Sequence, residues 1–199
     1  AGFMIGTGGT AQVAQQLGRG NKEKANRYFS MMVCFTVLLG ILLAAIGIAV
    51  IRPVCVLLGA TPEMMEGCVL YGRIVIAFTP AFMLQNVFQS FLAAAEKPKL
   101  GLFVTVAAGL TNAALDALFI VGFRWGLAGA ALATGLGQVV GGVLPLIYFL
   151  RPNNSLLRLT GKPTLEAKPI LKACGNGSSE MMSNIASSLV GMLYNFQLL

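Results

Sequence analysis

The sequence of residues 100–123, LGLFVTVAAGLTNAALDALFIVGF, contains a single charged side chain, that of Asp116. A helix needs about 20 apolar residues to cross the hydrocarbon core of a bilayer. Backbone groups in lipid must be hydrogen-bonded within their own segment, so this stretch is predicted to be a membrane-spanning helix. An ionisable side chain inside such a span is costly and usually lines an ion or substrate path.

Four further stretches are long, apolar and free of charge: residues 31–51, 74–95, 125–150 and 181–199. The helix that contains the last stretch is expected to begin earlier, near Lys168, and residues 1–17 are expected to be the end of another helix. Over the whole chain 56% of residues are hydrophobic and 11% are charged, against about 25% charged in soluble domains. The chain is therefore predicted to be an all-α membrane protein, a polytopic helical bundle.

Basic residues mark one side of this bundle. Eleven of the 14 lysines and arginines lie in three alternate loops, at residues 18–27, 96–99 and 151–172, and the intervening loops hold only Arg52, Arg73 and Arg124. The positive-inside rule places the basic loops in the cytoplasm. We therefore expect a multi-pass protein of the cell inner or plasma membrane, with the lipid bilayer as its partner. The net charge of +7 follows from this topology, so no nucleic-acid partner is expected.

The longest loop divides the chain into two parts. It carries the turn formers Pro152, Gly161 and Pro163, which are typical of a boundary. Residues 1–150 are predicted to form a partial amino-terminal lobe of about five membrane helices, 151–167 a cytoplasmic linker, and 168–199 the first helix of a carboxy-terminal lobe. Both ends of the chain are apolar, so it is expected to be an internal part of a longer chain.

Polar side chains inside the spans are the candidate functional residues. Asn112 lies one helical turn before Asp116, and Thr105 and Gly109 continue the same face. Amide and hydroxyl oxygens that reach this face would be cation ligands, so the predicted cation-binding and coupling residues are Asp116, Asn112, Asn86 and Thr134. Candidate substrate-cavity residues are Gln85, Gln89, Gln138, Glu180, Asn184 and Asn195. Structural readings stay open: Asp116 could serve helix packing, and Glu180 could be a solvated residue near a helix end.

The prolines inside the spans, and the lack of histidine and of CxxC motifs, give two further predictions. Pro80 and Pro145 remove helical hydrogen bonds and are predicted kinks or hinges, although Pro80 could equally mark an ordinary bend. The chain has no histidine, and its four cysteines form no CxxC pair. No resident metal and no cofactor is therefore expected, apart from a coupling H⁺ or Na⁺ ion.

Four stretches resemble the multidrug and toxic compound extrusion (MATE) transporters, in particular the bacterial multidrug branch. They are residues 15–25 (QQLGRGNKEKA), 88–98 (FQSFLAAAEKP), 112–116 with 126–134 (NAALD and GLAGAALAT), and 177–182 (GSSEMM). The resemblance implies helices two to seven of a twelve-helix, two-lobe, monomeric transporter. It also implies that Asn86, Asn112, Asp116 and Thr134 fall at the family's cation site. Members often carry a proline near the start of helix seven, where this chain has ACGNG at residues 173–177.

The function implied is a cation-coupled (H⁺ or Na⁺) antiporter that exports organic cations or amphipathic drugs by alternating access. The alternative is a flippase of lipid-linked saccharides, which would need basic side chains inside the spans, and none is present. No enzyme activity is expected, because Asp116 is the only aspartate and a membrane prenyl transferase needs paired aspartates for Mg²⁺. A channel is a further option, but no filter motif is visible.

Overall fold

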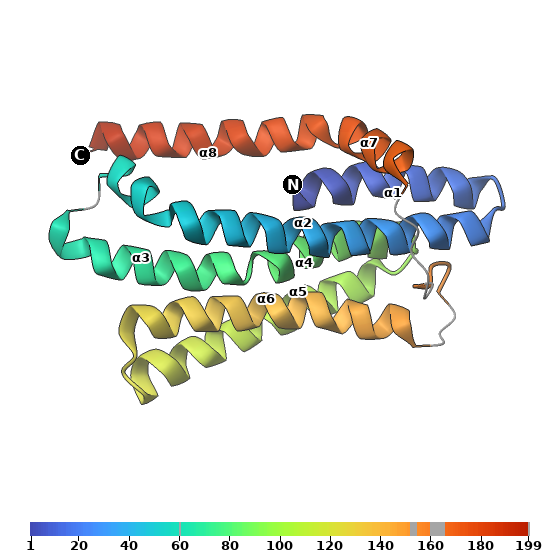
Figure 1. Ribbon diagram of the computed structural model, residues 1–199. Helices are drawn as coiled ribbons and strands as arrows, with labels where there is room; N and C mark the ends of the chain where they lie inside the picture. Colours follow the sequence, from blue (N-terminus) through green and yellow to red (C-terminus); the bar gives the residue numbers. More distant parts are fainter. Residues whose placement is uncertain (60, 152–154, 160–165, 199) are drawn as a thin grey trace.

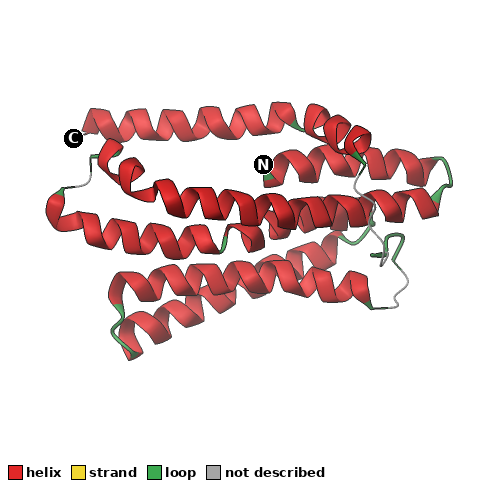
Figure 2. Ribbon diagram, in the orientation of Figure 1, coloured by secondary structure: helices red, strands yellow, loops and turns green. Residues whose placement is uncertain are grey.

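The computed structural model describes residues 1–59, 61–151, 155–159 and 166–198, and within these ranges it contains helices and loops but no strand (Figure 2). The helices in chain order (Figure 1) are α1 (Gly2–Gly18), α2 (Lys22–Leu57), α3 (Pro62–Ala77), α4 (Thr79–Ala94), α5 (Pro98–Asp116), the π-helix η1 (Ala117–Gly122), α6 (Gly126–Leu150), α7 (Ala167–Asn176) and α8 (Ser178–Leu198). The predicted all-α fold is confirmed.

Three of these elements are long and apolar enough to cross a membrane. They are α2, the continuous segment Pro98–Gly122 formed by α5 and η1, and α6, and the bent pair α3 and α4 makes a fourth if it is counted as one span. The fifth predicted span, residues 181–199, falls in α8, which is not among them. The reason lies in its composition, because serine and asparagine recur along α8 between its apolar residues.

The span predicted at residues 74–95 is not one straight helix. α3 ends at Ala77, α4 begins at Thr79, and the two axes differ by 46°. Pro80 lies in the first turn of α4. N–H groups in the first turn make no intrahelical hydrogen bond, so the missing N–H of proline costs nothing there. In contrast, α6 runs through Pro145 without a break.

The helix that follows the linker begins at Ala167, close to its predicted start, but it is interrupted at Gly177. A Cβ atom on Gly177 would lie 2.0 Å from the carbonyl oxygen of Met4, and one on Gly8 would lie 1.8 Å from the carbonyl oxygen of Ala173. The α7–α8 junction and α1 therefore touch backbone to backbone, and only glycine fits at these two positions.

The largest core cluster joins α1, α2, α4, α6 and α7. At its centre, the ring centroid of Phe29 lies 4.8 Å from those of both Phe91 and Phe149. Leu157 of the linker is fully buried in the same cluster. Edge-to-face ring contacts of this kind add to the stabilisation that area burial provides.

The described part of the linker is docked on the start of α2. The N–H group of Arg158 donates to Asn26 Oδ1 at 2.9 Å, and Glu166 forms an ion pair with Arg27. The predicted turn formers Pro152, Gly161 and Pro163 lie outside the described residues.

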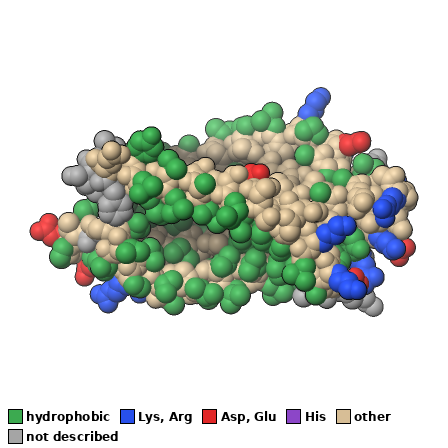
Figure 3. Space-filling model, turned by 90° about the horizontal axis from the view of Figure 1, so that it is seen from above, with side chains coloured by type: hydrophobic (Ala, Val, Ile, Leu, Met, Phe, Trp, Pro, Cys, Tyr) green, Lys and Arg blue, Asp and Glu red, His purple; other side chains and the backbone are tan. Residues whose placement is uncertain are grey.

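The surface is divided by side-chain type along the length of the bundle. On the face that Figure 3 shows, lysine and arginine side chains gather mainly at the end where Figure 1 places the α1–α2 turn, and hydrophobic side chains cover the middle. An apolar belt with basic residues at one end is the distribution that a membrane-spanning bundle requires.

Candidate functional site

Small residues on α6 set how closely it packs against α5. A Cβ atom on Gly137 would lie 3.0 Å from the Cβ of Asn112, and one on Gly129 would lie 2.9 Å from the Cβ of Phe119. These two contacts show that α6 runs antiparallel to α5 and η1 and packs closely against them both before and after Asp116 along the chain.

A cavity of about 300 Å³ opens beside this seam. It is here called the α5–α6 cavity, and it is lined by Phe82, Gln85, Thr105, Ala108, Gly109, Asn112, Thr134, Gly137 and Gln138. The face predicted from the sequence, Thr105, Gly109 and Asn112, lies along one wall. Side-chain oxygens from three helices therefore meet at one place, which is the donor chemistry that a hard cation prefers.

Two buried polar atoms near this cavity lack hydrogen-bond partners among the described residues. They are Nδ2 of Asn112 and Oδ1 of Asp116. More than nine in ten buried polar groups in proteins are hydrogen-bonded, so such atoms call for a ligand, an ion or water. Asp116 does not itself line the α5–α6 cavity, but its position one turn beyond Asn112 puts it at the edge of this polar region.

Directly after Asp116 the helix changes from α to π geometry. In η1 the N–H group of Phe123 donates to the carbonyl of Leu118, five residues earlier, at 2.9 Å. The rings of Phe119 and Trp125 stack at 5.2 Å and hold the turn into α6. Short π segments occur frequently at functional sites. No composition signal in residues 117–122 predicted this change.

Of two adjacent candidates on α4, only one reaches the cavity. Gln85 lines it and lies against Gly141, where a Cβ atom would be 2.5 Å from the Gln85 Cδ. The amide of Asn86 donates instead to the Phe82 carbonyl of its own helix at 2.8 Å. The structure does not bring Asn86 to Asn112 and Thr134, because one residue along a helix turns the side chain by about 100°.

The other two glutamines also differ from each other. Gln138, which was predicted to line a substrate cavity, lies in the lining of the α5–α6 cavity. Gln89 donates to the carbonyl of Gly101 at 3.2 Å and to Thr105 Oγ1 at 2.8 Å. Gln89 therefore joins α4 to α5, and the structure places it outside the cavity lining.

A second cavity, the α1–α8 cavity, has a volume of about 320 Å³. Its lining is mainly apolar and consists of Ala1, Phe3, Met181, Asn184, Ile185, Ser188, Leu189 and Met192. Asn184 was predicted here, and its amide donates to the backbone carbonyl of Glu180 at 2.8 Å. The Glu180 side chain is exposed, and the side chain of Asn195 lies outside the described part of the chain.

The sequence analysis missed the apolar residues of this second cavity. The apolar residues Met181, Ile185 and Met192 lie on one helical face together with the polar Ser188, at spacings of four, three and four. That periodicity was the available signal. Phe3 carries no comparable signal, because only the packing of α1 against α8 brings it here.

A resident metal cluster is not indicated within the described ranges, where no group of three or more cysteine, aspartate or glutamate side chains comes together. Among the described residues, those that bring side-chain oxygens to the lining of the α5–α6 cavity are Gln85, Thr105, Asn112, Thr134 and Gln138, and the carboxylate of Asp116 does not line it.

Comparison with known proteins supports a transporter. The chain is 27% identical over 155 residues to the multidrug export protein MepA of Staphylococcus haemolyticus, covering 78% of this chain and 34% of that protein. It is 24% identical over 196 residues to MepA of Staphylococcus saprophyticus, covering 98% of this chain and 43% of that protein. The chain thus spans less than half the length of these curated relatives.

Solved structures share the fold. Inward-facing and outward-facing conformations of a multidrug resistance MATE family transporter of the MOP superfamily superpose with TM-scores of 0.80 and 0.82, each at 22% identity. They cover 87% and 94% of this chain, and the chain covers 39% and 42% of theirs. A MOP superfamily transporter from Pyrococcus furiosus gives 0.86 at 21% identity, with 94% of this chain and 42% of that chain covered. The MatE family model matches residues 1–118, which is more than half of the sequence, and the chain therefore belongs to the MatE family of multidrug and toxic compound extrusion transporters, whose members are membrane proteins.

Proposed function

We propose that the complete protein is an antiporter of the cell membrane that exports organic cations or amphipathic drugs in exchange for H⁺ or Na⁺. Transport proceeds by alternating access, in which two lobes rock about a site between them. α1 to α6 belong to the first lobe and α8 to the second. The proposal extends the export activity named for the MepA relatives to this chain.

The observation that carries the coupling proposal is the unpartnered Oδ1 of Asp116 beside the α5–α6 cavity. A carboxylate at this depth is costly while it is charged and alone. Binding a proton or Na⁺ neutralises it. In this proposal the ion is shared with oxygen atoms of Asn112, one helical turn before Asp116, and of Thr134, on the α6 wall of the cavity. Loading and unloading the ion would change how tightly α5 packs on α6.

The α1–α8 cavity supports the drug part of the proposal. Methionine and large aliphatic side chains adapt to ligands of different shape, and Asn184 and Ser188 supply a few polar contacts. Neither cavity is lined by lysine or arginine in the part of the chain that the structure describes. This lining suits organic cations and gives no support to a flippase that must hold a pyrophosphate.

The test is Asp116→Asn in the full-length protein, reconstituted in proteoliposomes with an imposed pH or Na⁺ gradient. The substitution keeps the size of the side chain and removes its charge, so gradient-driven drug export should fall at least tenfold while the protein still inserts. Glu63→Gln, at an exposed carboxylate in the first turn of α3, is the matched control and should transport normally. Normal coupled export by Asp116→Asn would refute the coupling site.

Two variants of Thr134 distinguish Na⁺ coupling from H⁺ coupling. Thr134→Ser keeps the hydroxyl oxygen and Thr134→Val removes it at nearly constant volume. If Na⁺ is the ion, export driven by a Na⁺ gradient should persist in the serine variant and weaken in the valine variant. If H⁺ on Asp116 is the ion, both variants should respond to a pH gradient as the unmodified protein does.

A further inference from the structure

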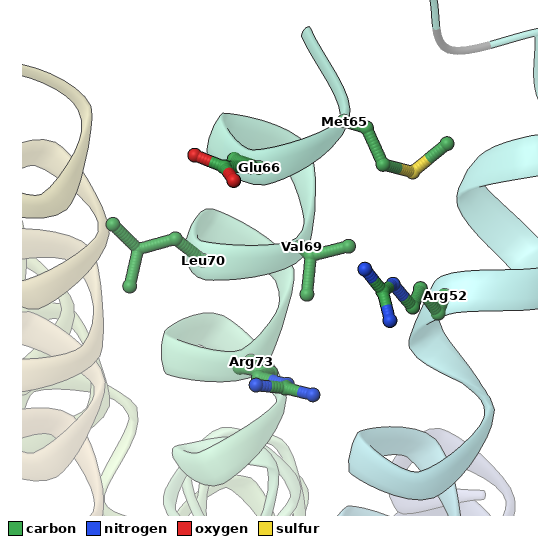
Figure 4. Close-up of a pocket in the computed structure, with 6 residues that line it drawn as sticks. All are labelled: Arg52, Met65, Glu66, Val69, Leu70 and Arg73. Atoms are coloured by element: carbon green, nitrogen blue, oxygen red, sulfur yellow. The ribbon is translucent and has the colours of Figure 1, made fainter. Parts of the chain in front are cut away.

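A third pocket lies between α2 and α3, away from both cavities of the proposed transport path. Its volume is about 310 Å³, and it is lined by Arg52, Met65, Glu66, Val69, Leu70 and Arg73. Figure 4 shows the guanidinium groups of Arg52 and Arg73 directed into the space between the two helices, with the Glu66 carboxylate on the side of α3 away from α2. This site is here called the arginine pocket.

The two arginines have no protein partner in the described ranges. Among the residues that the structure describes, neither guanidinium has a hydrogen-bond partner and no carboxylate oxygen, including those of Glu66, lies within 4.0 Å of one. Two like charges that share one pocket repel each other. An anion between them would turn this repulsion into attraction.

The arginine pocket lies at the edge of the apolar spans. Arg52 directly follows the uncharged stretch 31–51, and Arg73 directly precedes the uncharged stretch 74–95. This position in the sequence predicts that both guanidinium groups lie near the boundary between the bilayer hydrocarbon and the lipid phosphates. Arginine at the end of a span commonly reaches to this interface.

The distribution of charge makes the pair distinctive. The loop between α2 and α3 lies opposite the basic loops, on the side where the positive-inside rule leaves few cations. Arg124 is the other basic residue on that side. Two of these three arginines nevertheless meet in a single pocket, so general topology does not account for them.

The helices that carry the arginines are in contact at this level. A Cβ atom on Gly72 would lie 2.6 Å from Cδ1 of Ile51, and Ile51, Val69 and Cys55 form a small buried cluster. The two guanidinium groups thus project from elements that are packed together, which lowers the entropic cost of holding a ligand.

We propose that the arginine pocket binds the phosphodiester of a phospholipid in the non-cytoplasmic leaflet. The two guanidinium groups point into the space between α2 and α3 and the Glu66 carboxylate points away from it, so the space between them is positively charged and attracts the negative charge of a phosphodiester. Guanidinium groups donate paired hydrogen bonds to phosphate oxygens in a fixed geometry. The bound lipid bridges α2 and α3 and holds this end of the first lobe together.

The test measures lipid binding by the purified full-length protein, independently of export. Native mass spectrometry and thermal unfolding in detergent are followed while phosphatidylglycerol is added. Arg52→Gln with Arg73→Gln should weaken binding at least tenfold and abolish the rise in Tm that the lipid produces. Arg124→Gln, which removes an arginine on the same side outside the pocket, should bind within twofold of the unmodified protein.

Three results would overturn the proposal. They are undiminished lipid binding by the double variant, an equal loss in Arg124→Gln, and an equal rise in Tm with inorganic phosphate alone, which would indicate a soluble anion as the ligand. If the double variant does not fold, lipid binding is measured with Arg73→Lys instead, because lysine keeps the positive charge but cannot donate paired hydrogen bonds to a phosphate. That variant should bind phosphatidylglycerol at least threefold more weakly, and undiminished binding would refute the arginine pair.

Discussion

Replacing Gly8 by alanine would test the contact between α1 and the α7–α8 junction. The added Cβ would lie 1.8 Å from the carbonyl oxygen of Ala173 and 2.9 Å from the backbone nitrogen of Gly177. Both neighbours are backbone atoms, so no side-chain rotation relieves the clash. Real Cβ contacts essentially never fall below 3.0 Å, so the junction must move away by about 1.2 Å, the difference between 3.0 and 1.8 Å.

Overpacking of this kind costs about 1–3 kcal/mol. In an alternating-access cycle the cost applies only to the conformation in which α1 touches the junction. The population ratio between that conformation and one in which they are apart should shift by about 5- to 150-fold. Gly8→Ala should therefore favour separation of α7 from α1 without unfolding the bundle.

The assay is a distance distribution from spin labels at the exposed positions Lys99 and Leu171 of the full-length protein in nanodiscs. Gly8→Ala should enrich the longer distances. Gly175→Ala is the matched control, because Gly175 lies on α7 and a Cβ there meets nothing within 4 Å. Identical distributions for the two variants would show that the close approach is not required and would refute the reasoning.

Three variants at the end of the bundle where residues 155–159 and 166 contact α2 test what stabilises it. Leu157→Ala should lower the free energy of unfolding by about 2–5 kcal/mol, because Leu157 is fully buried. Glu166→Gln should change the free energy of unfolding by less than about 1 kcal/mol, because Arg27 and Glu166, the two members of its ion pair, are about half exposed, at 48% and 46%. Phe29→Ala should cost about 3–5 kcal/mol by removing the ring at the centre of the aromatic cluster. Thermal or denaturant unfolding in detergent measures the change in all three variants. If Leu157→Ala and Glu166→Gln lower the free energy of unfolding equally, burial of Leu157 is not the main interaction that holds the linker on α2.

Much of the candidate site was accessible from the sequence because it depends on local spacing. Asn112 and Asp116 share a helical face at a separation of four residues, whatever that helix packs against. Thr134 stands out as a polar residue in a stripe of small ones. The choice between Gln85 and Asn86 was not accessible, since both are polar and adjacent. The rotation of α4 about its axis, set by its packing on α6 at Gly141, decides which of them faces the cavity.

The sequence by itself determined that the chain forms apolar helices in a membrane, with a carboxylate in one span and basic residues at one end. These properties follow from composition and from the need to satisfy backbone hydrogen bonds in lipid. The sequence also predicted a kink at Pro80, and the structure gave its size, 46°. Only the tertiary structure decided that the last helix is interrupted at Gly177, that η1 begins after Asp116, and that Arg52 and Arg73 line one pocket. The break at Gly177 and the arginine pocket depend on contacts between separate helices, which no local pattern of residues encodes.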